Sequence, residues 1–87
     1  MGWLDGLILA DGFEEAFIGV SHRYGFDEPV AAYDRDKCID ILMKEGMDRE
    51  VAEEHFAFNV LGAWVGEATP VFVEVTSLEQ LELSLSL

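Results

Sequence analysis

Apolar and polar residues follow two different periods along the chain, and the longest regular stretches have the period of a helix. Residues 34–45 carry a broad apolar face, with Asp34 in the position of an N-cap and Gly46 at the C-terminal stop. Residues 48–65 show the same helical pattern, with Asp48 in the position of the N-cap. Only two residues separate the stretches, so they predict a helical hairpin. The side chains expected on the buried side of the second helix are Val51, Ala52, His55, Phe56, Asn59, Val60, Ala63 and Trp64.

The segment 13–24 is compatible with two structures. Its apolar residues fall at helical spacing, and Glu14 and Glu15 would occupy the first turn of a helix. The β-branched run around Gly19 instead favours a strand from residue 16 to about 23, joined by a loop to a second strand at 30–33. The pattern alone leaves helix and hairpin open.

The C-terminal third predicts strands. Val71, Val73 and Val75 share one face of a strand that follows Thr69-Pro70. In the tail, every second residue is a leucine, which is the pattern of a half-buried strand. Ser77-x-x-Gln80 competes with this interpretation, because a capping box begins a short helix. We favour the strand, formed by the alternating leucines Leu81, Leu83, Leu85 and Leu87.

The composition indicates one small folded domain. The chain has 87 residues, and 51% of them are hydrophobic, which is too many for a disordered acidic tail. We expect a single domain over residues 1–87, with an N-terminal arm at 1–12 and a C-terminal tail at 76–87 that adds a strand. The predicted fold is α+β: a β-hairpin, a helical hairpin and one or two C-terminal strands, in the order β-β-α-α-β-β.

The net charge of −13 argues against several classes of binding partner. Eighteen Asp and Glu oppose five Lys and Arg, which argues against direct binding to nucleic acid or to anionic membranes. The single cysteine, Cys38, cannot form an intrachain disulfide, and the first twelve residues lack the positive charge of a signal peptide. No apolar run is long enough to span a bilayer. A cytoplasmic protein is therefore expected.

An acidic cluster at the start of the second helix is the candidate partner-binding site. Its members are Asp48, Glu50, Glu53 and Glu54, and Arg49 is the one cation among them. Glu50 and Glu54 form a like-charge i,i+4 pair, which mildly destabilises a free helix. A basic partner would relieve this repulsion, whereas a purely solvating role would also account for the cluster.

The sequence contains no motif for catalysis, cofactor binding or metal binding. A Cys38–His55 pair across the helical hairpin would supply a nucleophile and a base, but Cys38 lies on an apolar helix face, where an inert buried thiol is far commoner. The two histidines lack metal-ligand spacing, and residues 11–15 lack the alternating ligands of a calcium loop. We therefore expect no enzyme activity, no catalytic residues, no cofactor and no metal.

Three runs resemble a family of small, uncharacterised proteins from bacteriophages and bacterial mobile elements. They are Phe58-Asn59-Val60-Leu61-Gly62-Ala63-Trp64-Val65-Gly66-Glu67-Ala68-Thr69-Pro70-Val71-Phe72, Glu14-Glu15-Ala16-Phe17-Ile18-Gly19-Val20 and Tyr33-Asp34-Arg35-Asp36-Lys37-Cys38. The resemblance covers residues 9–72 and brings no activity or site residue with it. It implies a tight connection before Tyr33, which favours the hairpin, and a phage-related origin.

These observations lead to two functional hypotheses. The first is a non-enzymatic binding protein that occupies a surface of a host or defence protein, such as the basic nucleic-acid channel of a nuclease. It would act as an inhibitor, and as a DNA mimic if its carboxylates are spaced like phosphates. The second is a structural or regulatory homo-oligomer assembled through Leu81, Leu83 and Leu85 of the tail.

Overall fold

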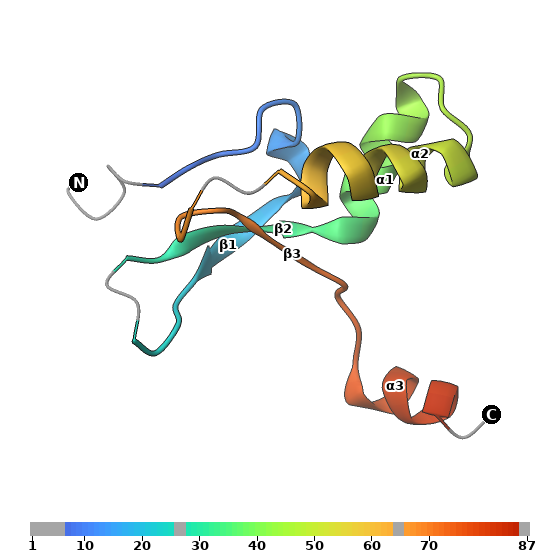
Figure 1. The fold of residues 1–87 in the computed structure, drawn as a ribbon. Coiled ribbons are helices and arrows are strands. Elements are labelled where there is room, and N and C mark those ends of the chain that lie inside the picture. The colour runs from blue at the N-terminus through green and yellow to red at the C-terminus, as the bar shows by residue number, and fades with distance from the viewer. Residues whose placement is uncertain (1–6, 26–27, 64–65, 86–87) are drawn as a thin grey trace.

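The computed structural model describes residues 7–25, 28–63 and 66–85, and its architecture is the predicted α+β fold. Figure 1 shows a small sheet with two helices on one side and a third helix set apart at the C-terminus. The elements follow the order η2 (Glu14–Ala16), β1 (Phe17–Ser21), β2 (Val30–Asp34), α1 (Arg35–Lys44), α2 (Arg49–His55), η3 (Phe56–Leu61), β3 (Val71–Val73) and α3 (Leu78–Leu85). Within the described ranges, every helix is too short or too polar to cross a lipid bilayer.

The three strands form one sheet in the order β1-β2-β3. β1 and β2 are antiparallel, with Ser21 opposite Val30, so the hairpin prediction is confirmed and the helical alternative is wrong. β2 and β3 are parallel, with Tyr33 opposite Phe72. A parallel pair requires a crossover connection, and the helical hairpin supplies it.

Local hydrogen bonds begin both helices where the sequence predicts. Asp34 Oδ1 accepts a hydrogen bond of 3.2 Å from the backbone N–H of Lys37, and Asp48 Oδ1 accepts one of 2.9 Å from that of Val51. Gly46, in the link between the helices, has a φ of 109°, which a residue with a side chain adopts only with strain. The chain can therefore leave α1 sharply and turn back into α2.

The core lies between the sheet and the helical hairpin. A continuous row of rings crosses it: Tyr33 stacks on Phe72 with a centroid distance of 5.7 Å, and Phe72 and Phe56 pack edge-to-face at 5.1 Å. The N-terminal segment closes the same side, because the Ala10 N–H donates a 2.8 Å hydrogen bond to the Tyr33 hydroxyl. The buried cluster consists of Phe13, Ala16, Ala31, Tyr33, Cys38, Ile39, Leu42, Ala52 and Phe56.

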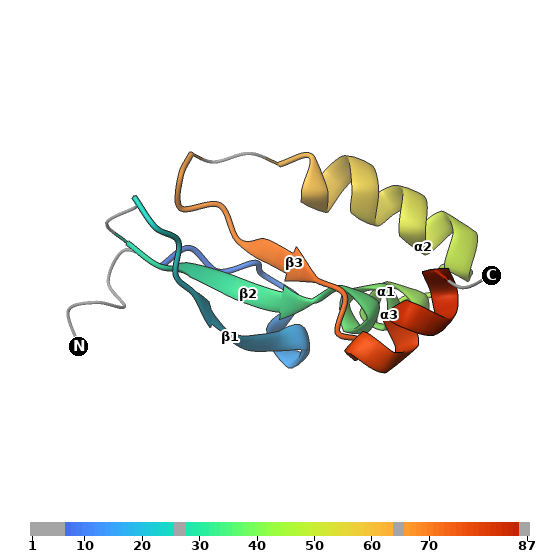
Figure 2. The same ribbon diagram turned by 90° about the horizontal axis from the view of Figure 1, so that it is seen from below.

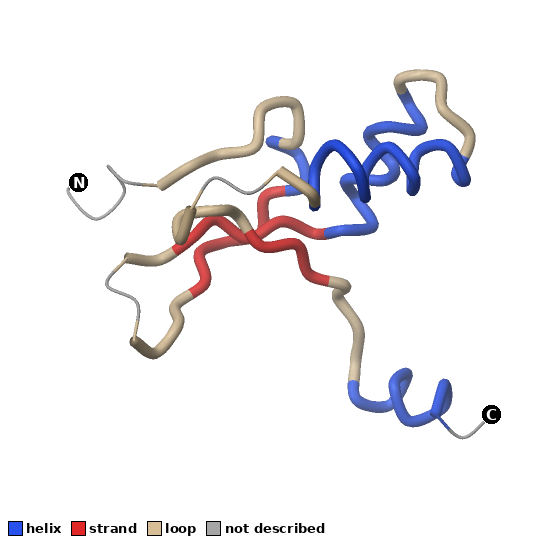
Figure 3. The backbone as a smooth tube through the Cα atoms, viewed as in Figure 1, coloured by secondary structure: helices blue, strands red, loops and turns tan. Residues whose placement is uncertain are grey.

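The tail is a helix, so the predicted strand at 81–87 is wrong for residues 81–85; residues 86 and 87 lie outside the described residues. Figure 3 shows this segment as a short helix after an extended linker. The helix-start signal prevails: Ser77 Oγ accepts a 3.1 Å hydrogen bond from the Gln80 N–H, and the Gln80 side-chain oxygen accepts one of 3.4 Å from the Thr76 hydroxyl. Leucine, glutamate and glutamine also have a higher intrinsic propensity for helix than for strand. The two-residue spacing of the leucines does not reflect this propensity.

The second helix changes its winding at Phe56. Residues 56–61 form a π-helix, η3, in which each turn is wider than in an α-helix. The predicted buried side therefore holds at Ala52 and Phe56 but fails at Asn59 and Ala63, which are exposed. Helical structure ends at Leu61, earlier than predicted, and Trp64 and Val65 lie outside the described residues. β3 likewise ends at Val73 instead of Val75.

Candidate partner-binding surface

Two of the four predicted site residues are engaged in the local structure of α2. Asp48 is the N-cap described above. The Glu53 Oε1 atom lies 3.3 Å from Arg49 Nε, one helical turn earlier. A carboxylate that caps a helix or pairs with a neighbouring guanidinium has part of its charge compensated. Asp48 and Glu53 are therefore less available to a partner than the sequence suggested.

The other two predicted residues, Glu50 and Glu54, are free to meet a partner. Both side chains are exposed, and neither has an ion pair or hydrogen bond with another described residue. They stand one turn apart on the outer side of α2, so their charges add on one face. The predicted acidic cluster is thus reduced to this pair.

Exposed apolar side chains accompany the two glutamates, and the sequence analysis did not identify them. Val51 is 48% exposed, although it was predicted to be buried, and Phe58 is 80% exposed. Phe58 follows Glu54 by four residues, at the start of the π-helix η3, and continues the exposed part of the helix surface. The sequence did contain one sign of this exposure, because the aromatic residue Phe58 lies outside the predicted buried positions of the helix. We call Glu50, Val51, Glu54 and Phe58 the α2 face.

The positively charged residues are distributed unevenly along the chain. All five Lys and Arg lie before residue 50, so the second part of the chain carries seven glutamates and no compensating cation. Arg35 lies near Asp36 and Glu74, with nitrogen–oxygen distances of 3.7 and 3.9 Å. The α2 face therefore meets solvent with its negative charge unbalanced.

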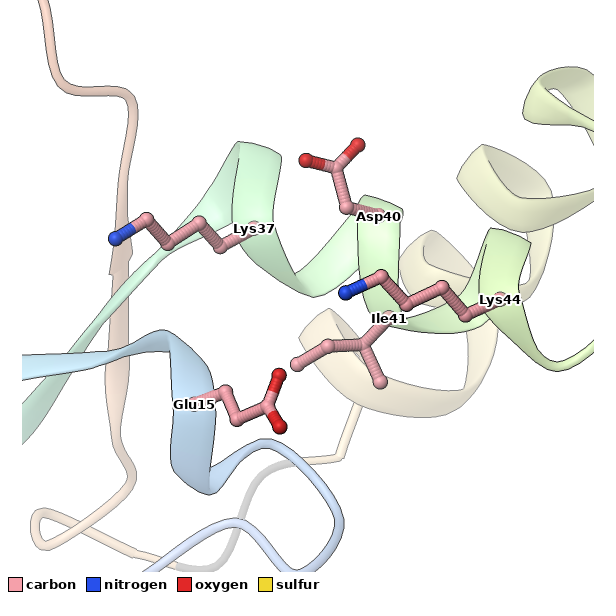
Figure 4. Close-up of a pocket in the computed structure, with 5 residues that line it drawn as sticks. All are labelled: Glu15, Lys37, Asp40, Ile41 and Lys44. Atoms are coloured by element: carbon pink, nitrogen blue, oxygen red, sulfur yellow. The ribbon is translucent and has the colours of Figure 1, made fainter.

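The two lysines line a shallow hollow of about 290 Å³ between η2 and α1. Glu15, Asp40 and Ile41 complete its lining, and Figure 4 shows the Asp40 carboxylate pointing away from Glu15. The two lysine ammonium groups and the two carboxylates balance, so the net charge of the hollow is close to zero. The hollow has no nucleophile and no enclosed polar group, so its side chains suit surface solvation better than catalysis.

Cys38 is a core residue and a poor nucleophile. Its side chain has no exposed surface. Burial raises the pKa of the thiol from 9.0 to about 11, and the negative charge of Asp34 adds to the rise. The reactive form of cysteine is the thiolate, which is nearly absent at neutral pH under these conditions.

The raised pKa of Cys38 predicts a loss of stability in alkali. The folded state favours the protonated thiol, so this contribution is fully present below about pH 9 and is lost as the pH rises through about 11. The urea midpoint should therefore fall more steeply from pH 9 to 11 in the parent than in Cys38→Ala. Parallel pH profiles would show that the thiol is not protected.

The remaining polar candidates form no chemical centre. His55 Nδ1 and Asn59 Nδ2 lie 3.3 Å apart, one helical turn from each other, but Asn59 is exposed although it was expected on the buried side of the helix. Among residues 7–25, 28–63 and 66–85, no three His, Cys, Asp or Glu side chains gather as metal ligands would. The α2 face is therefore the strongest candidate site.

Comparisons of the chain with protein-family models, with curated proteins and with solved structures find no match. The function must consequently be inferred from the chemistry of the surface.

Proposed function

We propose that this protein is a non-enzymatic, acidic binding protein that occupies a basic surface of a partner protein. The observation that carries the proposal is the α2 face, where Glu50 and Glu54 are exposed without an ion pair beside the exposed ring of Phe58. Exposed carboxylates alone would be explained by a helix face that is simply solvated. A large aromatic side chain in water among them is better explained by a partner that covers it.

The two kinds of side chain contribute differently to such a complex. The unpaired carboxylates, together with a net charge of −13, accelerate the approach of a basic surface and repel acidic competitors. Phe58 provides apolar area at the centre of the contact, where aromatic residues contribute most of the binding energy. The proposed complex is therefore steered by charge and held by an aromatic anchor.

The resemblance to phage proteins supports a host or defence protein as the target, met in the cytoplasm of the host cell. A nuclease channel, which binds phosphates through Lys and Arg, has the required charge. The α2 face would then block the channel as an inhibitor. It imitates the charge of nucleic acid, and nothing on this face requires it to imitate the helical spacing of phosphates.

The test compares two double charge reversals. Glu50→Lys with Glu54→Lys removes the charge of the α2 face, and Asp36→Lys with Asp40→Lys makes the same change at i,i+4 positions on α1. Each double variant changes the formal net charge from −13 to −9. Basic proteins captured from a bacterial lysate by the immobilised parent should be retained by the α1 variant and lost by the α2 variant.

Two further readouts identify the mode of binding. The association rate of a captured partner should fall as salt is raised, because exposed charges act over about 8 Å at physiological ionic strength. Duplex DNA should compete for the partner if the occupied surface is a nucleic-acid channel. Equal capture by both reversed variants, independent of salt, would make the carboxylates a solubility feature and overturn the proposal.

A further inference from the structure

The sheet ends in two outer strands, β1 and β3, and each has one edge that pairs with no other described strand. Figure 2 shows β2 between them, as the strand order β1-β2-β3 requires. An outer strand presents a row of backbone N–H and C=O groups that can pair with another chain. Whether such an edge invites pairing depends on the features that protect it.

The edge of β1 is protected by a β-bulge. Between the positions opposite Tyr33 and Ala32, β1 contains one residue more than β2, namely Ile18. The next residue, Gly19, has a φ of 151°, which a residue with a side chain adopts only with strain. A bulge bends an edge strand and interrupts its row of backbone groups, which hinders pairing with a further strand.

The edge of β3 has no such protection. Residues 71–76 contain no proline, no glycine and no cation, and five of the six are β-branched or aromatic, as strands prefer. Residues 73–76 are exposed, and the backbone of residues 71–76 is hydrogen-bonded to no described segment other than β2. The segment therefore has the composition of a strand and an outer edge that is open to another chain.

β3 is short because its neighbour ends, and not because its own sequence changes. The last pair of the β2–β3 ladder joins Asp34 to Val73, and Asp34 is also the N-cap of α1. Beyond this pair, Glu74 and Val75 have no described strand beside them. A strand added along the outer edge would therefore pair with β3 and also extend it beyond Val73.

Charge indicates which kind of chain suits this edge. The Glu74 side chain is 71% exposed, and its 3.9 Å contact with Arg35 Nε is too exposed to compensate the carboxylate fully. Alternation along an extended strand places Val73 and Val75 on the side opposite Glu74. A matching strand therefore carries apolar residues at every second position and Lys or Arg between them. A second copy of this chain fits poorly, because its net charge is −13 and its own edge carries a glutamate.

We propose that the outer edge of β3 is a second binding site, which accepts an extended, basic segment of a partner protein as the fourth strand of the sheet. Backbone hydrogen bonds hold the segment, and its alternating side chains provide the specificity. Its cations lie beside Glu74, and its apolar residues lie beside Val73 and Val75. This site belongs to β3 and the residues after it, whereas the α2 face belongs to α2 and η3, so the two proposals can fail separately.

A synthetic heptapeptide of alternating lysine and valine, with lysine at both ends, is the probe. It should bind the parent chain and slow hydrogen exchange at the outward backbone amides of residues 71–76, because amides within a new β-ladder are protected. The control is the same peptide with every backbone amide nitrogen methylated. It keeps the charge and the side chains but cannot donate hydrogen bonds, so neither binding nor protection should be seen. Equal binding of the two peptides would show attraction by net charge alone and would overturn the proposal.

A matched pair of charge reversals locates the site on the chain. Glu74→Lys and Glu79→Lys each change the formal net charge from −13 to −11, but only Glu74 follows directly on β3. The first should weaken peptide binding by roughly fivefold or more, and the second should change it by less than about twofold. Both side chains are exposed, and circular dichroism verifies folding. Equal weakening by the two reversals would show that the peptide binds elsewhere.

The double reversals of α2 and α1 separate this site from the α2 face. Both double variants carry the same net charge and leave the edge of β3 unchanged, so they should bind the peptide equally. Weaker binding by the α2 variant alone would place the peptide on the α2 face and overturn the edge as its site.

The parent chain without peptide tests a second copy as the alternative occupant. Its outward amides at residues 71–76 should exchange rapidly, and sedimentation velocity should give the 9.7 kDa of one chain. A dimer in which these amides are already protected would assign the edge to a second copy and overturn the basic segment as its occupant.

Discussion

Truncation of Phe56 to alanine lowers the free energy of unfolding by about 3–5 kcal/mol. The ring has no exposed surface and joins three elements: it extends from the end of α2, packs edge-to-face with Phe72 of β3 at a centroid distance of 5.1 Å, and lies 5.7 Å below the Arg35 guanidinium of α1. Neighbouring side chains that belong to different elements cannot all close the resulting cavity. For a domain of this size the loss is most of its stability.

Phe58→Ala is the matched control, because it removes the same ring two residues away. Phe58 is 80% exposed, so its truncation should change stability by less than about 0.5 kcal/mol. Urea unfolding followed by far-ultraviolet circular dichroism measures both variants. A Phe56→Ala midpoint close to that of Phe58→Ala would show that the ring is peripheral, contrary to the structure.

Truncation of Tyr33 to alanine should be almost as costly, about 3 kcal/mol or more. Tyr33 is 1% exposed and lies in the central strand, where its ring packs edge-to-face with Phe17 at 5.6 Å and stacks on Phe72 at 5.7 Å. Its hydroxyl also accepts the hydrogen bond from the Ala10 N–H. The residue therefore joins the sheet to the N-terminal segment as well as to the neighbouring rings.

The conservative variant separates these two contributions. Tyr33→Phe keeps the ring and removes only the acceptor, so it should cost about 1 kcal/mol and accelerate hydrogen exchange at the Ala10 amide. Tyr24→Phe, at a fully exposed tyrosine, should change neither quantity. Unchanged exchange at Ala10 in Tyr33→Phe would mean that the hydroxyl does not hold the N-terminal segment.

Much of the fold follows from local sequence signals. Asp34 and Asp48 begin helices because each carboxylate accepts a hydrogen bond from an N–H three residues later, an interaction that requires no distant partner. The hairpin was less certain, because the pattern of residues 13–24 left helix and strand open and only the family resemblance favoured the hairpin. The tail shows the limit of periodicity: alternating leucines predicted a strand, and the equally local bond of Ser77 to Gln80 accompanies a helix.

The candidate site could be predicted only in part. Local charge density identified Glu50 and Glu54, which are exposed, but it could not indicate that Arg49 pairs with Glu53. It also could not identify Phe58 as exposed, because burial depends on the direction in which a helix meets the sheet. The wider turns of the π-helix η3 change the direction in which side chains point after Phe56. A regular helical period in the sequence does not predict such a change.

The sequence by itself therefore determined where the elements begin, the α+β class and the excess of negative charge, because each depends on neighbouring residues or on composition. The tertiary structure decided which side chains remain in water. The parallel pairing of β2 with β3 placed both helices of the hairpin on one face, and no helix covers the opposite face of the sheet. On that side Val73 is 40% exposed, whereas Val30 and Ala32 of the central strand are buried. Burial is a property of packed layers, and a linear pattern specifies a face without specifying what covers it.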